Sequence, residues 1–147
     1  MKSFDSIEAI ERDIMKKCKA ALIKSQEQVY QIINRFVKEF YAEFTPEMYE
    51  RTYQLYSSLV KSDIVPDGNG YKAEVYFELS KLDYVTGSKP SGEQVMGAAE
   101  WGRHGAMGLA LAYFKGTSIW HEPLEILDAK AIDILKKMLI SEGIPIR

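Results

Sequence analysis

The chain has 147 residues, a length that suits one domain with a single hydrophobic core. Hydrophobic residues make up 46% of it and charged residues 27%, which excludes a largely disordered chain. The formal net charge of -2 argues against a broad phosphate-binding surface, so we expect no nucleic-acid specificity. The single cysteine, Cys18, excludes an intramolecular disulfide and favours a reducing compartment, with its thiol expected to be buried.

Residues 1–44 contain neither glycine nor proline, and their apolar residues recur at spacings of three and four. This pattern predicts a long amphipathic helix. The stripe comprises Ile7, Ile10, Ile14, Cys18, Ala21, Val29, Ile32, Ile33, Phe36 and Phe40. Charges every few residues at the start exclude a signal peptide and a membrane span there, so we expect cytosolic synthesis and no membrane contact.

A helix of this length is longer than a small domain needs, which leaves two readings open. In one, a single helix covers the sheet with part of its stripe and offers the surplus to another subunit. In the other, two helices fold on one core and the chain bends near Ser25. On the first reading, the expected oligomer-interface residues are Ile14, Val29, Ile32 and Phe36.

The remainder, residues 45–142, reads as an α+β body. Thr45 and Pro46 form a helix start, and the helix is expected to reach Val60. The sequence DGNG at 67–70 predicts a tight hairpin turn, followed by a strand at 71–79 whose partner is 60–65.

Further along, a capping-box spacing at Ser91 predicts a short helix that Gly102 ends, and residues 108–114 fit either a strand or a buried turn. The last helix is predicted over 123–140 and ends before Gly143. Residues 1–147 are therefore expected to form one α+β domain, with the long N-terminal helix and the C-terminal helix packed on a small antiparallel sheet.

The stretch AAEWGRHG, residues 98–105, is the densest group of chemically capable side chains. A metal-dependent enzyme using Glu100, His104 and His121 is one alternative. No metal-ligand, nucleophile or phosphate-loop motif accompanies these residues, however. We therefore favour a structural corner, and expect no catalysis, no cofactor and no bound metal.

Three segments resemble the small tail-component or head–tail joining proteins of long-tailed bacteriophages. The matching residues are Arg51, Thr52, Leu55, Ser58 and Leu59 in the first segment, Ala99, Glu100 and Gly102 in the second, and Pro123, Leu124 and Ala129 in the third. The likeness covers roughly residues 45–140. It departs from the commonest pattern at Tyr53, where glycine usually follows Arg-Thr.

The resemblance implies a non-catalytic virion protein of the neck or tail end, active in head–tail joining or tail completion. Its implied partners are copies of itself, arranged as a homo-oligomer and possibly a ring, and other neck and tail proteins. It implies location in the virion, and in the host cytoplasm during assembly. A bacterial protein-binding adaptor of the same fold is a second alternative, which the position of the gene among morphogenesis genes would separate.

Overall fold

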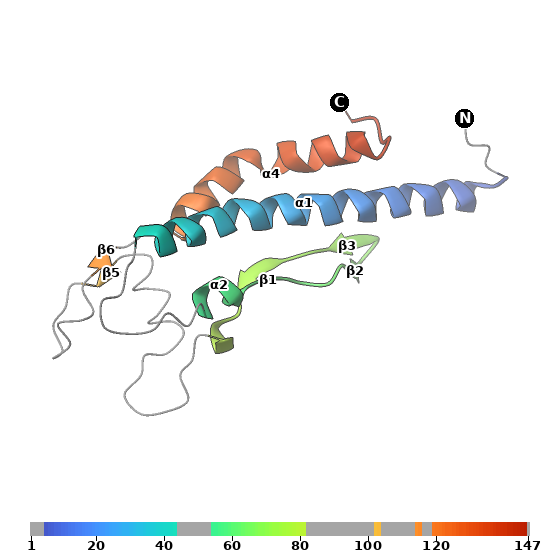
Figure 1. The fold of residues 1–147 in the computed structure, drawn as a ribbon. Coiled ribbons are helices and arrows are strands. Elements are labelled where there is room, and N and C mark those ends of the chain that lie inside the picture. The colour runs from blue at the N-terminus through green and yellow to red at the C-terminus, as the bar shows by residue number, and fades with distance from the viewer. Residues whose placement is uncertain (1–4, 44–53, 82–101, 104–113, 116–118, 147) are drawn as a thin grey trace.

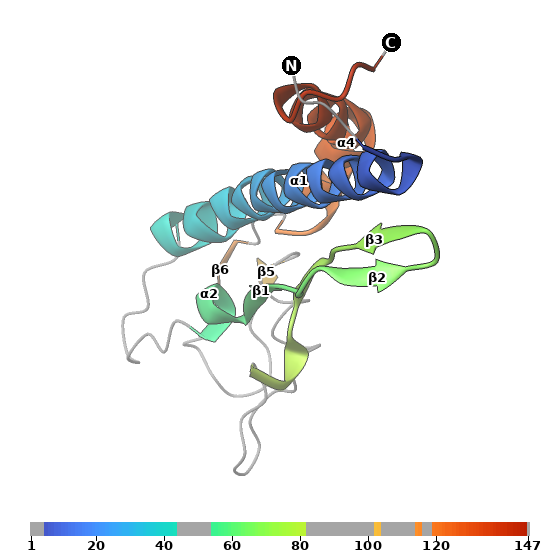
Figure 2. The same cartoon turned by 90° about the vertical axis from the view of Figure 1, so that its right-hand side faces the viewer.

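The computed structural model describes residues 5–43, 54–81, 102–103, 114–115 and 119–146. Two long helices, α1 (Ile7–Glu43) and α4 (His121–Ser141), lie antiparallel along each other (Figure 1). Antiparallel strands lie on the opposite side of α1, so α1 is the middle layer of three (Figure 2). The predicted α+β fold is confirmed, with the refinement that α4 packs mainly on α1.

Helix α1 is one uninterrupted helix of 37 residues, so the reading of two helices is wrong. It begins after Ser6, whose hydroxyl accepts a hydrogen bond from the N–H of Ala9 at 3.2 Å. Ser25 does not break the helix because its hydroxyl donates to the carbonyl of Ala21 at 2.8 Å. That bond satisfies a polar group that is buried within the helix packing.

The second helix is shorter than predicted. Only α2 (Gln54–Ser58) is helical in the described part of residues 46–60, and Leu59 and Val60 belong to strand β1 (Leu59–Lys61). Leu59 pairs with Phe77 of the neighbouring strand and is buried in the core. A helix continued through Leu59 would remove this pairing, so residues 59 and 60 are in a strand.

The predicted hairpin is present and has two parts. Strand β1 pairs with β4 (Val75–Phe77), and β2 (Val65–Asp67) pairs with β3 (Gly70–Lys72) across the expected turn. Gly68 has φ +56°, the left-handed backbone that this tight turn requires. A short 3₁₀ helix, η1 (Leu79–Lys81), follows β4 in place of the last residues of the predicted strand.

The two parts of the hairpin meet at a β-bulge. Residues 62–64 of one strand lie opposite residues 73–74 of the other, so one side carries an extra residue. At this point the Ser62 N–H donates to the Glu74 carbonyl at 2.9 Å. The Ser62 hydroxyl accepts from the Glu74 N–H at 2.8 Å, which replaces a missing backbone acceptor.

Helix α4 ends as the sequence predicts. Gly143 adopts φ +86°, and its N–H donates to the Ile140 carbonyl at 2.9 Å. The N–H of Ile144 donates to the Leu139 carbonyl at 3.0 Å, which completes a Schellman cap. Among the apolar residues of α4, Leu127 is buried and Ile134 and Met138 are half-buried, whereas Leu124, Ala131 and Leu135 are exposed.

The core lies between α1, the start of α4 and the strand pair β1–β4, which we call the inner hairpin. Ile33, Leu59 and Leu127 form its buried cluster. Half-buried side chains surround the cluster, namely Val29, Tyr30, Ile32, Val75, Phe77, Trp120 and Ile134. Trp120 meets Phe77 edge to face at a ring-centroid separation of 5.7 Å, so this indole serves the core.

The remaining described segments form a third strand pair. Strand β5 (Gly102–Arg103) is antiparallel to β6 (Phe114–Lys115), so Gly102 lies in a strand and the 108–114 segment ends in one. The helix starts predicted at Thr45 and Ser91 lie outside the described residues. In the part of the chain that is described, no helix combines the length and apolarity needed to cross a bilayer.

Candidate assembly surface

Of the residues that carry the phage-protein resemblance and are described in the structure, Ser58 and Pro123 are buried. Ser58 is fully buried, and its carbonyl accepts a hydrogen bond from the Glu78 N–H at 2.7 Å. Pro123 is buried in the first turn of α4, where its missing N–H costs nothing. Leu55 lies in α2 and Gly102 in β5. Arg51, Thr52 and Glu100 lie outside the described residues.

The residues of the metal alternative are only partly described. His121 is exposed at the first position of α4, whereas His104 and Glu100 lie outside the described ranges. Within those ranges, no three His, Cys, Asp or Glu side chains gather in a way that would hold a metal ion. Cys18 is half-buried rather than fully buried.

The predicted oligomer-interface residues divide into two groups. Phe36 is only 6% exposed, and Val29 and Ile32 pack against the core cluster of their own chain. Their place in the predicted interface is therefore corrected: α4 and the inner hairpin already cover this part of the stripe. Ile14 remains 46% exposed, so the surplus of the stripe lies further toward the N-terminus than predicted.

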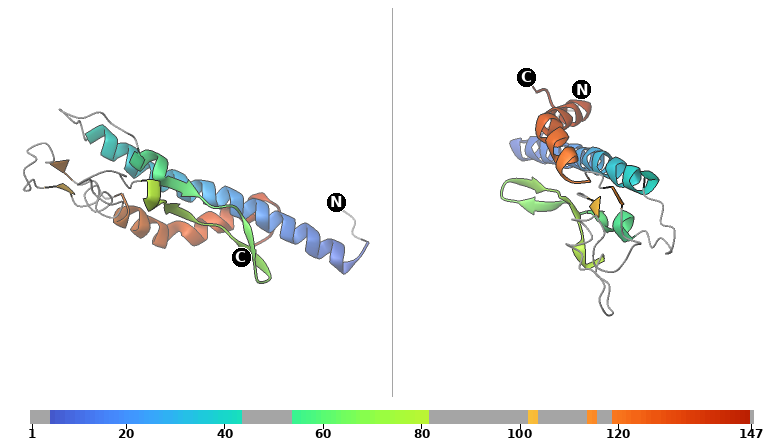
Figure 3. Two further views of the ribbon diagram at one scale, coloured as in Figure 1. Left: turned by 90° about the horizontal axis from the view of Figure 1, so that it is seen from below. Right: turned by 90° about the vertical axis from the view of Figure 1, so that its left-hand side faces the viewer.

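This surplus forms an overhang, which we define as residues 7–14 of α1. Helix α1 runs on past the end of α4 and past the turn of the β2–β3 hairpin (Figures 1 and 3). Ile7 is 77% exposed there, and Ile10 and Ile14 are also exposed on the same side of the helix. Three isoleucines at helical spacing on one exposed face are more than the scattered apolar residues of an ordinary surface.

A second apolar stripe lies on the outer side of α4, which we call the α4 outer stripe. It consists of Leu124, Ile132 and Leu135, all of them exposed, with Ile132 at 69%. Leu124 and Leu135 are eleven residues apart, close to three full helical turns, and therefore lie on one line. The sequence analysis did not identify Ile132 as part of an exposed stripe, although its spacing of three residues from Leu135 places the two side chains on neighbouring positions of one helix face.

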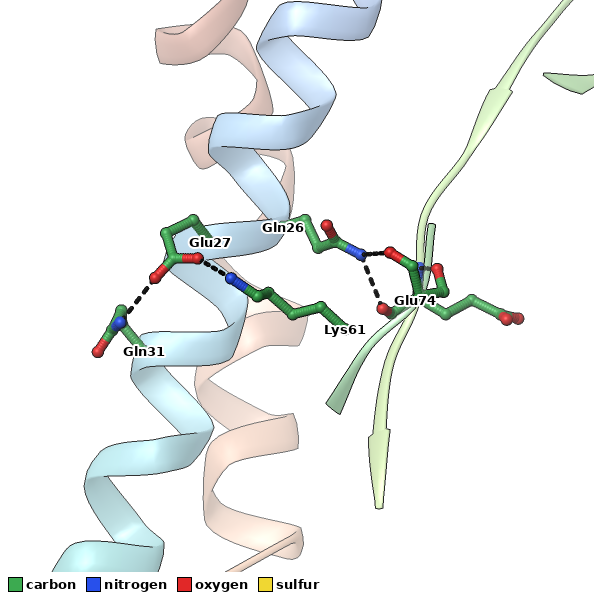
Figure 4. A network of polar contacts seen from close by, with 6 residues as sticks. Gln26, Glu27, Gln31, Lys61 and Glu74 are labelled. Carbon is green, nitrogen blue, oxygen red and sulfur yellow. Dashed lines mark hydrogen bonds and ion pairs between the residues drawn. The ribbon is translucent and has the colours of Figure 1, made fainter. Parts of the chain in front are cut away.

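A polar network fixes the inner hairpin to α1 and so determines which part of the stripe is covered. The side-chain amide of Gln26 donates to the carbonyls of Ser62 and Glu74, each at 2.9 Å (Figure 4). Both acceptors lie at the bulge, and the Glu74 carbonyl accepts from the Ser62 N–H as well as from Gln26. The amide therefore anchors the hairpin at its irregular point.

At the next residue of α1, Glu27 accepts hydrogen bonds from the ammonium group of Lys61 and from the Gln31 amide (Figure 4). The hydrogen bond from Lys61, aided by that from Gln31, holds the pKa of the Glu27 carboxyl below its usual range. Lys61 also lies over the ring of Tyr30, with Nζ 5.1 Å from the centroid.

The YomN family model matches residues 6–141. The chain belongs to the YomN family. This family name is derived from phages and prophages, and it indicates a phage-associated protein. Neither the curated proteins nor the solved structures gave a significant match.

The limits of the YomN match coincide with structural boundaries of the chain. The match begins at Ser6, which caps α1, and ends at Ser141, the last residue of α4. Both the overhang and the α4 outer stripe therefore lie inside the family region. In this YomN-family protein, both exposed apolar surfaces lie on helices within the matched residues.

Proposed function

We propose that this YomN-family protein is a virion structural component of the phage neck or tail end. It acts in head–tail joining or tail completion by assembling with copies of itself and with neighbouring neck and tail proteins. It is made in the host cytoplasm, resides in the virion and works without catalysis. The phage-derived family and the resemblance in the three motif segments support this role.

The single observation that carries the proposal is the overhang. Apolar side chains exposed in a row at helical spacing are typical of a surface that another protein covers. In a structural protein of a particle, such a surface connects subunits, and the energetic gain comes from burying apolar area.

The test removes the gene from the producing phage and examines the lysate by electron microscopy. We expect filled heads and separate tails, with joined particles restored when the gene is supplied in trans. Mass spectrometry of gradient-purified wild-type particles should detect the chain. Normal joined particles without the gene, or its absence from purified particles, would contradict the proposal.

A further inference from the structure

We infer that the α4 outer stripe pairs with the same stripe of a second copy, with the two α4 helices antiparallel. This inference rests on the proposed function, since it names one contact through which copies of the chain assemble. Both copies use the same surface, so the contact has two-fold symmetry and closes at a pair. The stripe is accessible to a second copy, because its residues are exposed and α4 is an outer layer of the molecule (Figure 2).

The first support is the charge pattern around the stripe. The carboxylates of Glu125 and Asp128 lie in the N-terminal half of α4, and the ammonium group of Lys136 lies in the C-terminal half. Each is four or seven residues from Ile132, so all three share its side of the helix. All three are exposed, and none has an ion-pair partner among the described residues.

These charges select the direction of the pairing. In an antiparallel pair, the acidic half of one α4 lies against the basic half of the other. The register that sets Lys136 against Glu125 of the other copy also brings it near Asp128, and symmetry repeats this contact twice. A parallel pair would instead set each charged residue against its own copy, which is repulsive.

The second support is the match of the apolar positions in the same register. The two-fold axis passes beside Ile132, which lies against Ala131 of the other copy and next to Leu135 of its own helix. Leu124 meets Leu139 of the other copy, once near each end of the pair. Apolar side chains therefore meet at the middle and at both ends, and the contact buries area that the single chain leaves exposed.

The third support is the position of α1. The side of α4 that carries Leu127 packs on the core, and Ile132 is five residues further on, about 140° around the helix. A second helix on the stripe therefore lies well apart from α1. The overhang extends past the C-terminal end of α4, so the antiparallel pair carries its two overhangs at opposite ends (Figures 1 and 3). Both overhangs stay open for further contacts in the particle.

Cysteine crosslinking of the full chain tests the contact. In a Cys18→Ser background, Ile132→Cys should form a disulfide-linked dimer under mild oxidation, because the two sulfurs meet beside the two-fold axis. The matched control is Ile140→Cys, since Ile140 is 55% exposed on another side of the same helix, and it should give little product.

Two differently tagged chains, carrying Glu125→Cys and Lys136→Cys in the same background, test the direction. An antiparallel pair predicts that their mixture gives more disulfide-linked dimer than either chain alone. A parallel pair predicts the reverse, because each cysteine would then face its own copy.

Two outcomes would overturn the inference in variants whose circular dichroism matches the wild type. One is equal crosslinking of Ile132→Cys and Ile140→Cys at every protein concentration. The other is self-crosslinking of the Glu125→Cys chain at the level of the mixture. If the chain is nevertheless found in purified particles, the proposed function stands and this contact alone fails.

A charge reversal adds a second readout. Lys136→Glu should weaken self-association about 2- to 30-fold, because two exposed ion pairs are lost in each pair of chains. Lys137→Glu is the control: it makes the same change at the next residue, which lies on the opposite side of the helix from Asp128. Equal weakening by both variants would show an effect of net charge and would contradict the register.

Discussion

The two ends of helix α1 carry similar apolar residues in very different surroundings. Around Ile33, the stripe is enclosed by α4 on one side and by the hairpin on the other. Around Ile10, the same periodicity continues, yet the isoleucines are exposed. The comparison shows that helical periodicity determines a face, while the lengths of neighbouring elements determine how much of it is buried.

The difference follows from simple lengths. Helix α1 has 37 residues and α4 has 21, so an antiparallel partner of that size covers only part of the longer helix. At about 1.5 Å per residue, the difference amounts to roughly 24 Å of helix. The hairpin is anchored by Gln26 and likewise leaves the N-terminal turns uncovered.

The largest expected effect separates the enclosed end from the exposed end. Ile33→Ala should lower the free energy of unfolding by about 2–5 kcal/mol, because it leaves a cavity in the core. Ile14→Ala should change it by less than about 0.5 kcal/mol. Urea unfolding at low protein concentration, where assembly adds no stability, measures both. Equal losses would show that the overhang is part of the monomer's core.

Gln26→Ala should rank next. It removes two hydrogen bonds and leaves two bulge carbonyls without their side-chain donor, so we expect a loss of about 1–2 kcal/mol in urea unfolding. Gln28→Ala, at an exposed position on the same helix, serves as the control and should be close to neutral. A neutral Gln26→Ala would mean that the hairpin is held to α1 by its apolar contacts alone.

Gly143→Ala tests the glycine at which α4 ends. An alanine must adopt the positive φ of the Schellman cap, which should cost about 1 kcal/mol in thermal or urea unfolding. A Cβ added at this position would lie 3.9 Å from Lys17 Nζ, an ordinary contact distance. The expected loss of stability therefore comes from backbone strain and not from a steric clash. Gly70→Ala, at a glycine without positive φ, should cost less.

The smallest expected effect is a pH dependence at the edge of the enclosed region. Because the pKa of Glu27 is lowered on folding, its ion pair stabilises the protein above pH 4.5. That contribution is lost as the pH falls through the folded-state pKa. With both groups substantially exposed, it should be only a few tenths of a kcal/mol.

Urea unfolding of the wild type and of Lys61→Met between pH 6 and 3 measures the contribution of the Glu27–Lys61 ion pair to stability. The stability difference between the two proteins should narrow as the pH falls. A constant difference across the range would assign the effect of Lys61 to its packing over Tyr30 instead.

Local signals in the sequence predicted several parts of the fold. The DGNG turn, the helix end at Gly143 and the helical nature of residues 7–43 follow from backbone preferences that act over a few residues. The extent of α2 did not, because Leu59 is drawn into a strand by its pairing with Phe77. At Leu59, the pairing between strands outweighs the local preference for helix.

The candidate site was predictable only in part. The sequence indicated a surplus apolar stripe, which was expected at Ile14, Val29, Ile32 and Phe36. The chain's own core takes up the last three, whereas Ile14 is exposed. The role of Gln26 was not visible at all, since its acceptors lie 36 and 48 residues away. Such contacts depend on three-dimensional packing and leave no periodic trace in the sequence.

The most direct test of the overhang as an assembly surface is native mass spectrometry of three full-length chains over a range of concentrations: wild type, Ile14→Asp and Ile23→Asp. The two substitutions place the same charge at equally exposed isoleucines on different sides of α1. We expect an oligomer for the wild type and for Ile23→Asp, and a smaller species for Ile14→Asp with unchanged circular dichroism. The same mass for all three chains would contradict the role of the overhang.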